Sequence, residues 1–483
     1  MKVFIDTQRS IGRYDDPTRW QNSTLRYAPP ADFPAYAESV IGRPAIHRAW
    51  ITLDEYWDMR TGEFFPDFEI GKKRRPDSEL HYLYDWGSVR PAPSGTRFRD
   101  YLTSHAACAD EVMLNVRRYE REVTDGILPI EKYAEIFAKA VEYCKELAPN
   151  IRYIEVTNES TLKSFGGLSA AEFVRLYLAA YSAVKALNEK HRYPIPLEVG
   201  GNAFSALLVN EDVWKETLRL LRESPIGDCP MDFYSLHIYD HGATVSLIKQ
   251  GRFEEAALGC VGKVKKGIAG HRAALKELGL PEKPVFMDEV GRTRTTGIDF
   301  DSLRNAAGVA GYLISHGTEG LEDVYYFPWC TFHNPELQIS FTQFLLRPDG
   351  SYAATPNGIA VMMMHRMKGE RLATAVSEAS GPDTEYRAIG VKDSGSVWAV
   401  ALNPTDRPEP LDLVFEGVGD GRFSLELFRC NSVDNNIVTG KGDGSLRLSA
   451  FVTLEASGGR LEYRDFLSND GFTQYRLTPV PEG

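Results

Sequence analysis

The chain has 483 residues, of which 43% are hydrophobic and 25% are charged, as in an ordinary soluble globular protein. Its formal net charge of −12 argues against nucleic acid or an anionic membrane as the main partner. No apolar run approaches the roughly 18 residues that a membrane span needs. We therefore expect a protein that binds neither nucleic acid nor membrane, and a homo-oligomeric state is left open.

The start of the chain carries no signal-peptide core, because the apolar stretch after Met1 is short and is broken by Asp6. The protein is expected to be cytoplasmic, or secreted or periplasmic with its signal peptide absent. The six cysteines are scattered and form no C-x-x-C pair, so no zinc or redox motif is visible. The histidines show no metal-binding spacing either. We therefore predict no metal site and no cofactor.

Residues 1–369 alternate strand-like and helix-like segments, which favours a parallel α/β architecture. The predicted strands are 2–6, 45–53, 111–116, 152–157, 196–200, 231–239, 284–288 and 323–328. The predicted helices are 35–41, 97–108, 130–147, 169–190, 212–222, 254–278, 301–315 and 355–367. About eight strand–helix repeats predict a (β/α)₈ TIM barrel. The rival is a doubly wound open sheet, which would usually carry a glycine-rich loop after its first strand; 6–9 is not one.

Two regions depart from the repeat. The segment 54–95 is too long for an ordinary barrel turn and is rich in aromatic residues, so we expect it to shape a substrate cleft. Residues 370–483 show short alternating runs separated by turn residues, at 397–402, 411–415, 424–427 and 446–448, without a helix pattern. The predicted organisation is a catalytic (β/α)₈ barrel over 1–369 and a C-terminal all-β sandwich accessory domain over 370–483.

Two short segments, Ile154–Ser160 and Val285–Gly291, each consist of an apolar run that ends on a carboxylate. They lie at the fourth and seventh predicted strands, whose C-terminal ends meet at the mouth of a barrel. Cleavage of a glycosidic bond needs an acid at the leaving oxygen and a nucleophile or activated water at the anomeric carbon. Glu159 and Glu289 can supply both groups. The alternative is that either Glu is a surface carboxylate at a strand end.

The neighbours of these carboxylates are further candidates. Asp288 precedes Glu289, and since successive side chains of a strand point to opposite faces, we expect only one to face the mouth. His237 and Tyr239 end the sixth predicted strand and share one face. Tyr239 is predicted to hold the nucleophile by a hydrogen bond, with His237 orienting the array. A buried His237 satisfied by the backbone is the alternative.

Four more residues are predicted to bind substrate. Asn158, next to the first Glu, can donate to the 2-hydroxyl of a sugar. Trp329, after the eighth predicted strand, can form the floor under a sugar ring, or it is a core residue. Arg48 can tune the charge of the nucleophile, and Asn115 at the end of the third predicted strand can contact substrate.

The chain resembles clan A glycoside hydrolases, most closely glycoside hydrolase family 39. The resemblance covers about residues 110–370 and, more loosely, the β domain. The matching pieces are Y-I-E-V-T-N-E-S, F-V-R-L-Y, E-V-G-G-N, D-F-Y-S-L-H-I-Y, V-F-M-D-E-V-G and P-N-G-I-A-V-M-M-M, in this order. Thr157 and Ser160 stand where family members commonly have Trp and Pro, and this leaves the sugar and the linkage open.

The resemblance implies a retaining double displacement on an oligosaccharide or polysaccharide, with Glu159 as acid/base and Glu289 as nucleophile. It also implies that the residues lining the sugar subsite are Asn158, His237, Tyr239 and Trp329. A retaining enzyme has its two carboxyl groups about 5–5.5 Å apart. The charge of Glu289 is then expected to favour the protonated form of Glu159.

Two alternative functions remain. One is a carbohydrate-binding barrel that has lost catalysis, although binding alone does not require paired acids. The other is a transglycosylase that uses the same two carboxylates, which would make products longer than its substrate.

Overall fold

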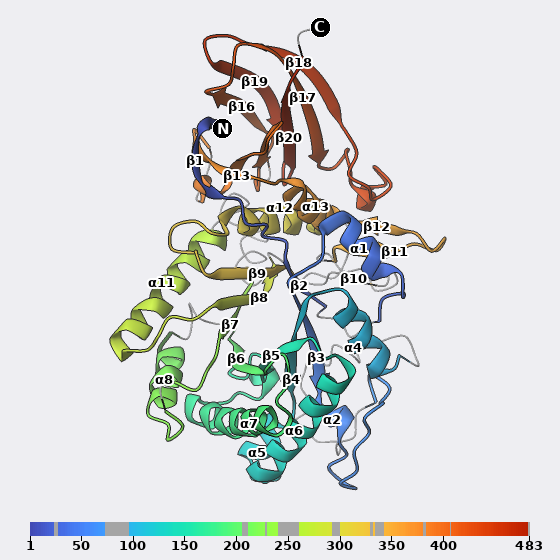
Figure 1. Ribbon diagram of the computed structural model, residues 1–483, viewed down its shortest axis with the longest axis vertical. Coiled ribbons are helices and arrows are strands. Elements are labelled where there is room, and N and C mark those ends of the chain that lie inside the picture. The colour runs from blue at the N-terminus through green and yellow to red at the C-terminus, as the bar shows by residue number, and fades with distance from the viewer. Residues whose placement is uncertain are drawn as a thin grey trace.

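The computed structural model describes residues 1–23, 28–72, 96–204, 211–227, 229–239, 260–291, 300–328, 332–333, 342–379, 383–405 and 407–481. It consists of an eight-stranded barrel surrounded by helices and a β domain that packs on one side of it (Figure 1). A buried ion pair joins the two parts, with Arg304 Nη2 of the barrel 3.1 Å from Asp470 Oδ2 of the β domain. The parts therefore pack closely.

The barrel is a parallel sheet whose strands follow one another in chain order. They are β2 (Trp20–Asn22), β3 (Ile46–Thr52), β4 (Glu111–Arg117), β5 (Ile151–Val156), β6 (Glu198–Phe204), β7 (Tyr234–Tyr239), β8 (Val285–Gly291) and β9 (Val324–Pro328). The ring of Trp20 packs against that of Tyr325 with centroids 4.6 Å apart, so the first and last strands meet. The predicted (β/α)₈ barrel is confirmed.

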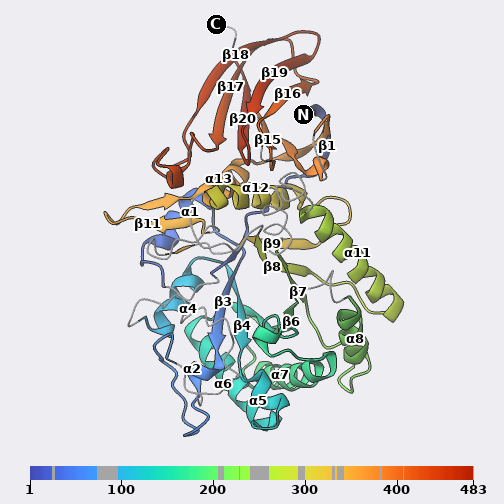
Figure 2. The ribbon, with the colours of Figure 1, turned by 180° about the vertical axis from the view of Figure 1, so that it is seen from behind.

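Helices cover the outside of the strands (Figure 2). They are α1 (Phe33–Ile41), α2 (Leu53–Tyr56), α4 (Phe98–Ala107), α5 (Glu120–Thr124), α6 (Ile130–Leu147), α7 (Ala170–His191), α8 (Glu211–Arg222), α11 (Cys260–Leu278), α12 (Phe300–Ser315) and α13 (Pro356–Arg366). The predicted start of α7 is confirmed by its capping box, in which the Ser169 hydroxyl accepts from the Glu172 amide and the Glu172 carboxylate accepts from the Ser169 amide. This fixes the helix that follows the first catalytic candidate.

The interior of the barrel has an apolar floor near the N-terminal ends of the strands. Its buried members are Trp20, Ile46, Met113, Phe233, Phe286 and Phe327. Side chains two residues further along a strand point the same way. Arg48 therefore follows Ile46 into the interior, Asn115 follows Met113, and a polar layer lies directly above the floor.

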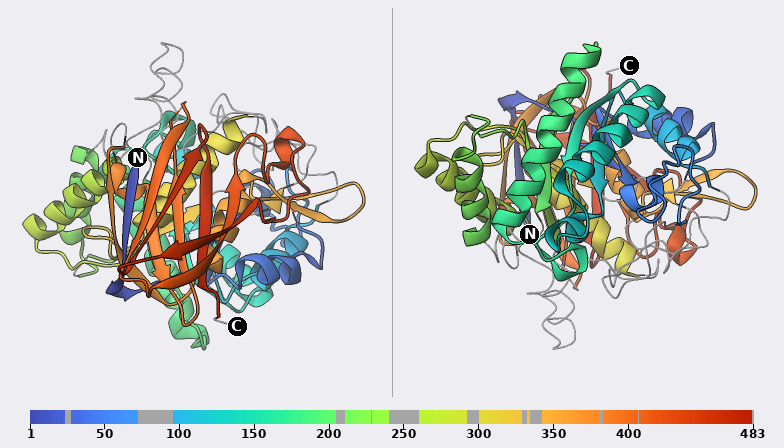
Figure 3. Two further views of the ribbon diagram at one scale, coloured as in Figure 1. Left: turned by 90° about the horizontal axis from the view of Figure 1, so that it is seen from above. Right: turned by 90° about the horizontal axis from the view of Figure 1, so that it is seen from below.

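The β domain is one nine-stranded sheet (Figure 3). Its strands are β1 (Lys2–Arg13), β13 (Glu370–Ser377), β14 (Ala388–Lys392), β15 (Val397–Leu402), β16 (Glu409–Glu416), β17 (Gly421–Cys430), β18 (Ala450–Ala456), β19 (Arg460–Leu467) and β20 (Phe472–Pro479). The two edge strands, β18 and β19, are consecutive and joined by a tight turn with a Ser457–Arg460 bridge. The sheet therefore folds over an apolar core of its own, as in the predicted sandwich.

Two sequence predictions of strands are wrong. Residues 2–6 do not start the barrel; β1 pairs antiparallel with β13 and parallel with β16. Its alternating burial suits a sheet with one covered face, whereas a central barrel strand is buried on both faces. The true first barrel strand, β2, has only three residues and two of them are polar, so no pattern revealed it. Residues 446–448 are not a strand, and β18 begins at Ala450. The domain boundary between 369 and 370 stays a proposal.

Smaller elements complete the described structure. A three-stranded sheet consists of β10 (Phe332–His333), β11 (Phe344–Leu346) and β12 (Tyr352–Ala354). Short 3₁₀ turns lie at η1 (Lys163–Phe165), η3 (Thr384–Tyr386) and η4 (Ile437–Thr439). Among the described helices, none is both long and apolar enough to cross a membrane.

The predicted role of the segment 54–95 in shaping a cleft stays a prediction. Tyr56 and Trp57 are buried, and the Tyr56 hydroxyl donates to the Lys139 carbonyl at 3.1 Å. The aromatic residues Tyr82, Tyr84 and Trp86 lie outside the described residues. A pocket of about 400 Å³ does open in this segment, but none of the predicted site residues line it.

Candidate active site

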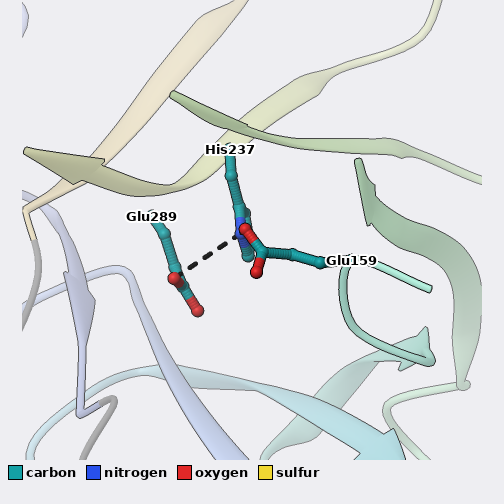
Figure 4. Close-up of side chains that lie close together, drawn as sticks. All are labelled: Glu159, His237 and Glu289. Carbon is teal, nitrogen blue, oxygen red and sulfur yellow. Dashed lines mark hydrogen bonds and ion pairs between the residues drawn. The ribbon is translucent and has the colours of Figure 1, made fainter. Parts of the chain in front are cut away.

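Three predicted residues converge at the C-terminal ends of the barrel strands (Figure 4). His237 Nδ1 lies 2.9 Å from Glu159 Oε1 and 3.5 Å from Glu289 Oε2. One atom from each of the three side chains lies within 4.8 Å of the other two. All three side chains are almost completely buried, with 3% or less of their surface exposed. The structure thus brings together two Glu that are separated by about 130 residues in the sequence.

The loop after β5 turns Glu159 into the barrel. Thr157 and Glu159 both have positive φ, at 68° and 49°. Such a conformation is unfavourable for a β-branched residue and persists only where the surroundings enforce it. Two contacts do so here: the Thr157 carbonyl accepts from Asn115 Nδ2 at 2.6 Å, and the Glu159 amide donates to the Asn202 carbonyl at 3.1 Å. The backbone on both sides of Asn158 is therefore held, and this fixes the direction in which the Glu159 side chain leaves the loop.

A β-bulge in β8 brings two carboxylates to the same face. Met287 lies opposite Leu236 and Glu289 opposite His237, so that Asp288 is an extra residue in the ladder. A bulge re-aims the side chains at the extra position. Asp288 Oδ2 and Glu289 Oε1 each lie 2.8 Å from the Arg48 guanidinium. The prediction that only one of the two would face the interior is wrong, because the bulge breaks the two-residue alternation.

Arg48 is the centre of the polar layer. Its guanidinium also donates to Glu155 Oε2 at 2.5 Å and to Asn158 Oδ1 at 3.0 Å. Burial alone would lower the pKa of Arg48, but the carboxylates of Asp288, Glu155 and Glu289 outweigh burial and raise it. The guanidinium is thus a buried positive charge in direct contact with Glu289.

The two predicted asparagines have different positions. Asn158 Oδ1 accepts a hydrogen bond from Arg48 Nη2. This contact orients the Asn158 amide so that Nδ2 can donate to a further partner. Asn115 Nδ2 instead donates to Glu155 Oε2 and to the Thr157 carbonyl, both at 2.6 Å. Through Nδ2, Asn115 supports the turn and the carboxylate layer, and its predicted contact with substrate stays a proposal.

His237 is charged near neutral pH. Burial acts to lower its pKa, but the negative charges of Glu289 and Asp288 and hydrogen bonds to Asp288 and Glu159 raise it to about 10. Both ring nitrogens then carry hydrogen, and the Nδ1–H points between the two Glu. The alternative of a His237 satisfied by the backbone does not hold, because its ring contacts carboxylates.

Glu155 and Asp288 are neighbouring carboxyl groups beneath the site. Burial raises the pKa of Glu155 to about 8, although Arg48 acts in the opposite direction. Burial acts to raise the pKa of Asp288 too, but Arg48 and His237 lower it to about 2. Glu155 is therefore neutral and Asp288 ionised at pH 7. Glu155 was not predicted, and the only signal for it was a charged residue between the apolar, buried Ile154 and Val156.

Among the described residues, the only group of three potential metal ligands is Glu159, His237 and Glu289. A metal ion requires the neutral form of a histidine. With the pKa of His237 raised to about 10, a metal would have to displace a proton held by several carboxylates. The trio therefore suits proton transfer better than metal binding. Of the other predicted residues, Tyr239 has only its place in β7 described, and Trp329 lies outside the described residues.

Comparisons with known proteins agree with this architecture. A glucosidase from Croceicoccus marinus has a TM-score of 0.61 at 12% identity, covering 99% of both chains. A monomeric beta-xylosidase from Caulobacter crescentus has a TM-score of 0.60 at 16% identity, covering 99% of this chain and 100% of its own. A GH39 enzyme from Xanthomonas axonopodis pv. citri has a TM-score of 0.59 at 15% identity, covering 99% and 97%.

These similarities are of fold, since the identities are low. The resemblance to glycoside hydrolase family 39 noted in the sequence is confirmed at that level. Searches against family models and against curated protein sequences found no match.

Proposed function

We propose that the protein is a retaining glycoside hydrolase that cleaves O-glycosidic bonds in an oligosaccharide or polysaccharide. The observation that carries the proposal is the pair of buried carboxylates, Glu159 and Glu289, with oxygens within 4.8 Å of each other at the mouth of the barrel. Inverting enzymes need about 6.5–9.5 Å between the carboxyl groups to admit a water molecule, and retaining ones about 5–5.5 Å. The short separation supports retention.

In the first step, Glu289 attacks the anomeric carbon while the bond to the leaving oxygen breaks. Arg48 Nη1, 2.8 Å from Glu289 Oε1, holds this carboxylate in place for the attack. Glu159 gives its proton to the leaving oxygen. Since His237 donates to Glu159 Oε1, the transferred proton is assigned to Oε2. The product is a covalent glycosyl-enzyme and a released alcohol.

In the second step, Glu159 accepts a proton from water, whose oxygen attacks the anomeric carbon and releases Glu289. The glycosyl-enzyme carries no charge on Glu289, so the repulsion that favoured the protonated form of Glu159 is gone. The Asn158 amide, fixed by Arg48, is positioned to donate to the 2-hydroxyl of the transferred sugar. Tyr239 and Trp329 remain proposed neighbours of that sugar.

The test is hydrolysis of a broad panel of aryl glycosides and of plant, algal and bacterial polysaccharides, beside the Glu289→Ala variant. We expect turnover by the wild type that vanishes in the variant, and a first product with the anomeric configuration of the substrate by NMR. Turnover that survives in Glu289→Ala would contradict the assigned nucleophile. An inverted product would contradict the double displacement.

The same panel distinguishes the alternative functions. Saccharide binding without turnover would point to a binding barrel. Products longer than the substrate would point to a transglycosylase. Hydrolysis is favoured over binding because the site has two carboxyl groups, Glu159 and Glu289, and binding alone needs no acid. Arg48, which holds Glu289, adds to this.

A further inference from the structure

The strand β6 carries a bulge like that of β8, on the other side of β7. Gly201 lies opposite Tyr234 and Phe204 opposite Leu236, so Asn202 and Ala203 together face the single residue Ser235. Ser235 lies two residues before His237 and therefore shares its interior face. Because both residues of such a bulge oppose one interior residue, the bulge turns Asn202 toward the interior of the barrel.

Asn202 is bound to the catalytic candidate by its backbone. Its carbonyl accepts from the Glu159 amide at 3.1 Å, and the adjacent Ala203 amide donates to the Ser235 hydroxyl at 2.9 Å. The pairing of Glu155 with Gly200 and of Val156 with Gly201 places Thr157 next to Asn202 at the end of the ladder. Asn202 is thus fixed beside Glu159, on the side away from β3 and Arg48.

The side chain of Asn202 has no hydrogen-bond partner among the described residues. Neither Oδ1 nor Nδ2 is bonded, although only 1% of the residue is exposed. The hydroxyl of the adjacent Thr157 is likewise buried and unbonded in the described structure. A buried polar atom without a hydrogen bond lowers the stability of the folded state. Native proteins keep such atoms where a water molecule or a ligand supplies the hydrogen bond. Asn202 is as buried as Glu159, which must itself reach the substrate.

We propose that Asn202 is a substrate-binding residue whose side-chain amide hydrogen-bonds the hydroxyl groups of the leaving-group sugar, next to Glu159. This rests on the proposed glycosidase function. The transferred sugar lies against Glu289 and the Arg48–Asn158 pair. The leaving sugar departs past Glu159, which protonates its oxygen, and β6 is the next strand on that side. An amide offers two donors and one acceptor, which suits adjacent sugar hydroxyls.

The test compares two leaving groups on the same sugar. Rates are measured for 4-nitrophenyl β-D-xylopyranoside and xylobiose, and for 4-nitrophenyl β-D-glucopyranoside and cellobiose. We expect Asn202→Ala to lower kcat/KM for the disaccharide about 5- to 50-fold, which corresponds to one or two hydrogen bonds, with the aryl glycoside changed less than about twofold. An equal loss on both substrates, or no loss on either, would overturn the proposal.

A stability measurement provides a readout that does not depend on turnover. Since the amide has no partner in the empty protein, Asn202→Ala should leave the Tm unchanged or raise it. The matched control is Asn188→Ala, because the Asn188 side chain bonds both the amide and the carbonyl of Leu197 at 2.8 and 2.9 Å. The control should lower the Tm and leave the ratio of disaccharide to aryl rates unchanged. A clear fall of Tm in Asn202→Ala would reveal a structural partner and contradict the assignment.

The two proposals fail differently. A wild-type protein that turns over nothing in the broad panel of glycosides and polysaccharides contradicts the proposed function. A wild type that cleaves both substrates, with a ratio that Asn202→Ala does not change, contradicts only the role of Asn202.

Discussion

The floor and the mouth of the barrel interior are built from the same strands and differ completely in chemistry. Along β3 the inward residues are Ile46 and then Arg48, and along β5 they are Tyr153 and then Glu155. Below lies a packed aromatic cluster; two residues higher lies a layer of charged and polar groups. The floor keeps water from beneath Arg48, so its ion pairs act in a medium of low dielectric constant. One strand thus serves stability at its start and chemistry at its end.

The strongest test of this division removes the acid at the mouth. Glu159→Gln keeps the size of the side chain but not its proton. We expect kcat/KM on a disaccharide to fall about 10²- to 10⁴-fold, the usual contribution of a general acid. Initial rates give the effect, and circular dichroism shows whether the fold is retained. A loss of less than about tenfold would mean that another group protonates the leaving oxygen.

The reciprocal test removes part of the floor. Phe286 is 3% exposed and its ring packs against those of Phe233 and Phe327. Phe286→Ala should lower the free energy of unfolding by about 3–5 kcal/mol, as for other buried Phe truncations. Well below the melting temperature, kcat/KM should change by only a few-fold. Urea unfolding measures the free energy of unfolding. A loss of activity without a loss of stability would contradict the division between a stabilising floor and a catalytic mouth.

Asp288 lies in the mouth but is not assigned to the reaction. It therefore tests whether a residue of the mouth can serve stability instead of catalysis. Asp288→Asn removes the charge that faces Arg48 and His237. We expect the free energy of unfolding to fall by about 2–3 kcal/mol, the scale of a buried hydrogen bond between charged groups. The control is Asp110→Asn, whose exposed pair with Arg43 has the similar distance of 2.7 Å and should cost about 1 kcal/mol or less. Equal losses in the two variants would mean that burial does not strengthen the pair.

Below pH 4.5, the smallest effect is expected for Glu155→Gln, which there replaces a neutral acid by a neutral amide. The pKa of Glu155 is raised from 4.5 to about 8, so its contribution to stability is complete below pH 4.5 and is lost as the pH rises through 8. The variant has no such loss. Relative to Glu155→Gln, the wild type should therefore become less stable between pH 4.5 and 8, as followed by Tm. A constant difference across this range would show that Glu155 is already ionised.

Much of the fold was predictable because it depends on local patterns. The amphipathic pattern over 130–147 matches α6, and Ser169 with Glu172 marks the start of α7. Strands with a continuous apolar run were found for the same reason. The short, polar β2 carries no such signal, and the pairing of β1 with β13 and β16 depends on residues far away in the chain.

The candidate site was predictable in its residue types but not in its register. Glu159, Glu289 and His237 were named from strand ends and Arg48 from its place within the second predicted strand, and the structure brings the four together. The bulge at Asp288 was not predictable, because a bulge is a relation between one strand and its neighbours. Asn202 was missed for the same reason.

The pairing of β1 has a consequence for the synthesis of the protein on the ribosome. Lys2 lies opposite Asp412 in the finished sheet, 410 residues later (412 minus 2). At about 5–20 residues per second, the first strand leaves the ribosome roughly 20–80 s before this partner exists. During that interval the barrel strands can already assemble, while β1 is a strand with two unpaired edges. We therefore expect that a barrel expressed without residues 370–483 would aggregate less if residues 1–13 were removed as well.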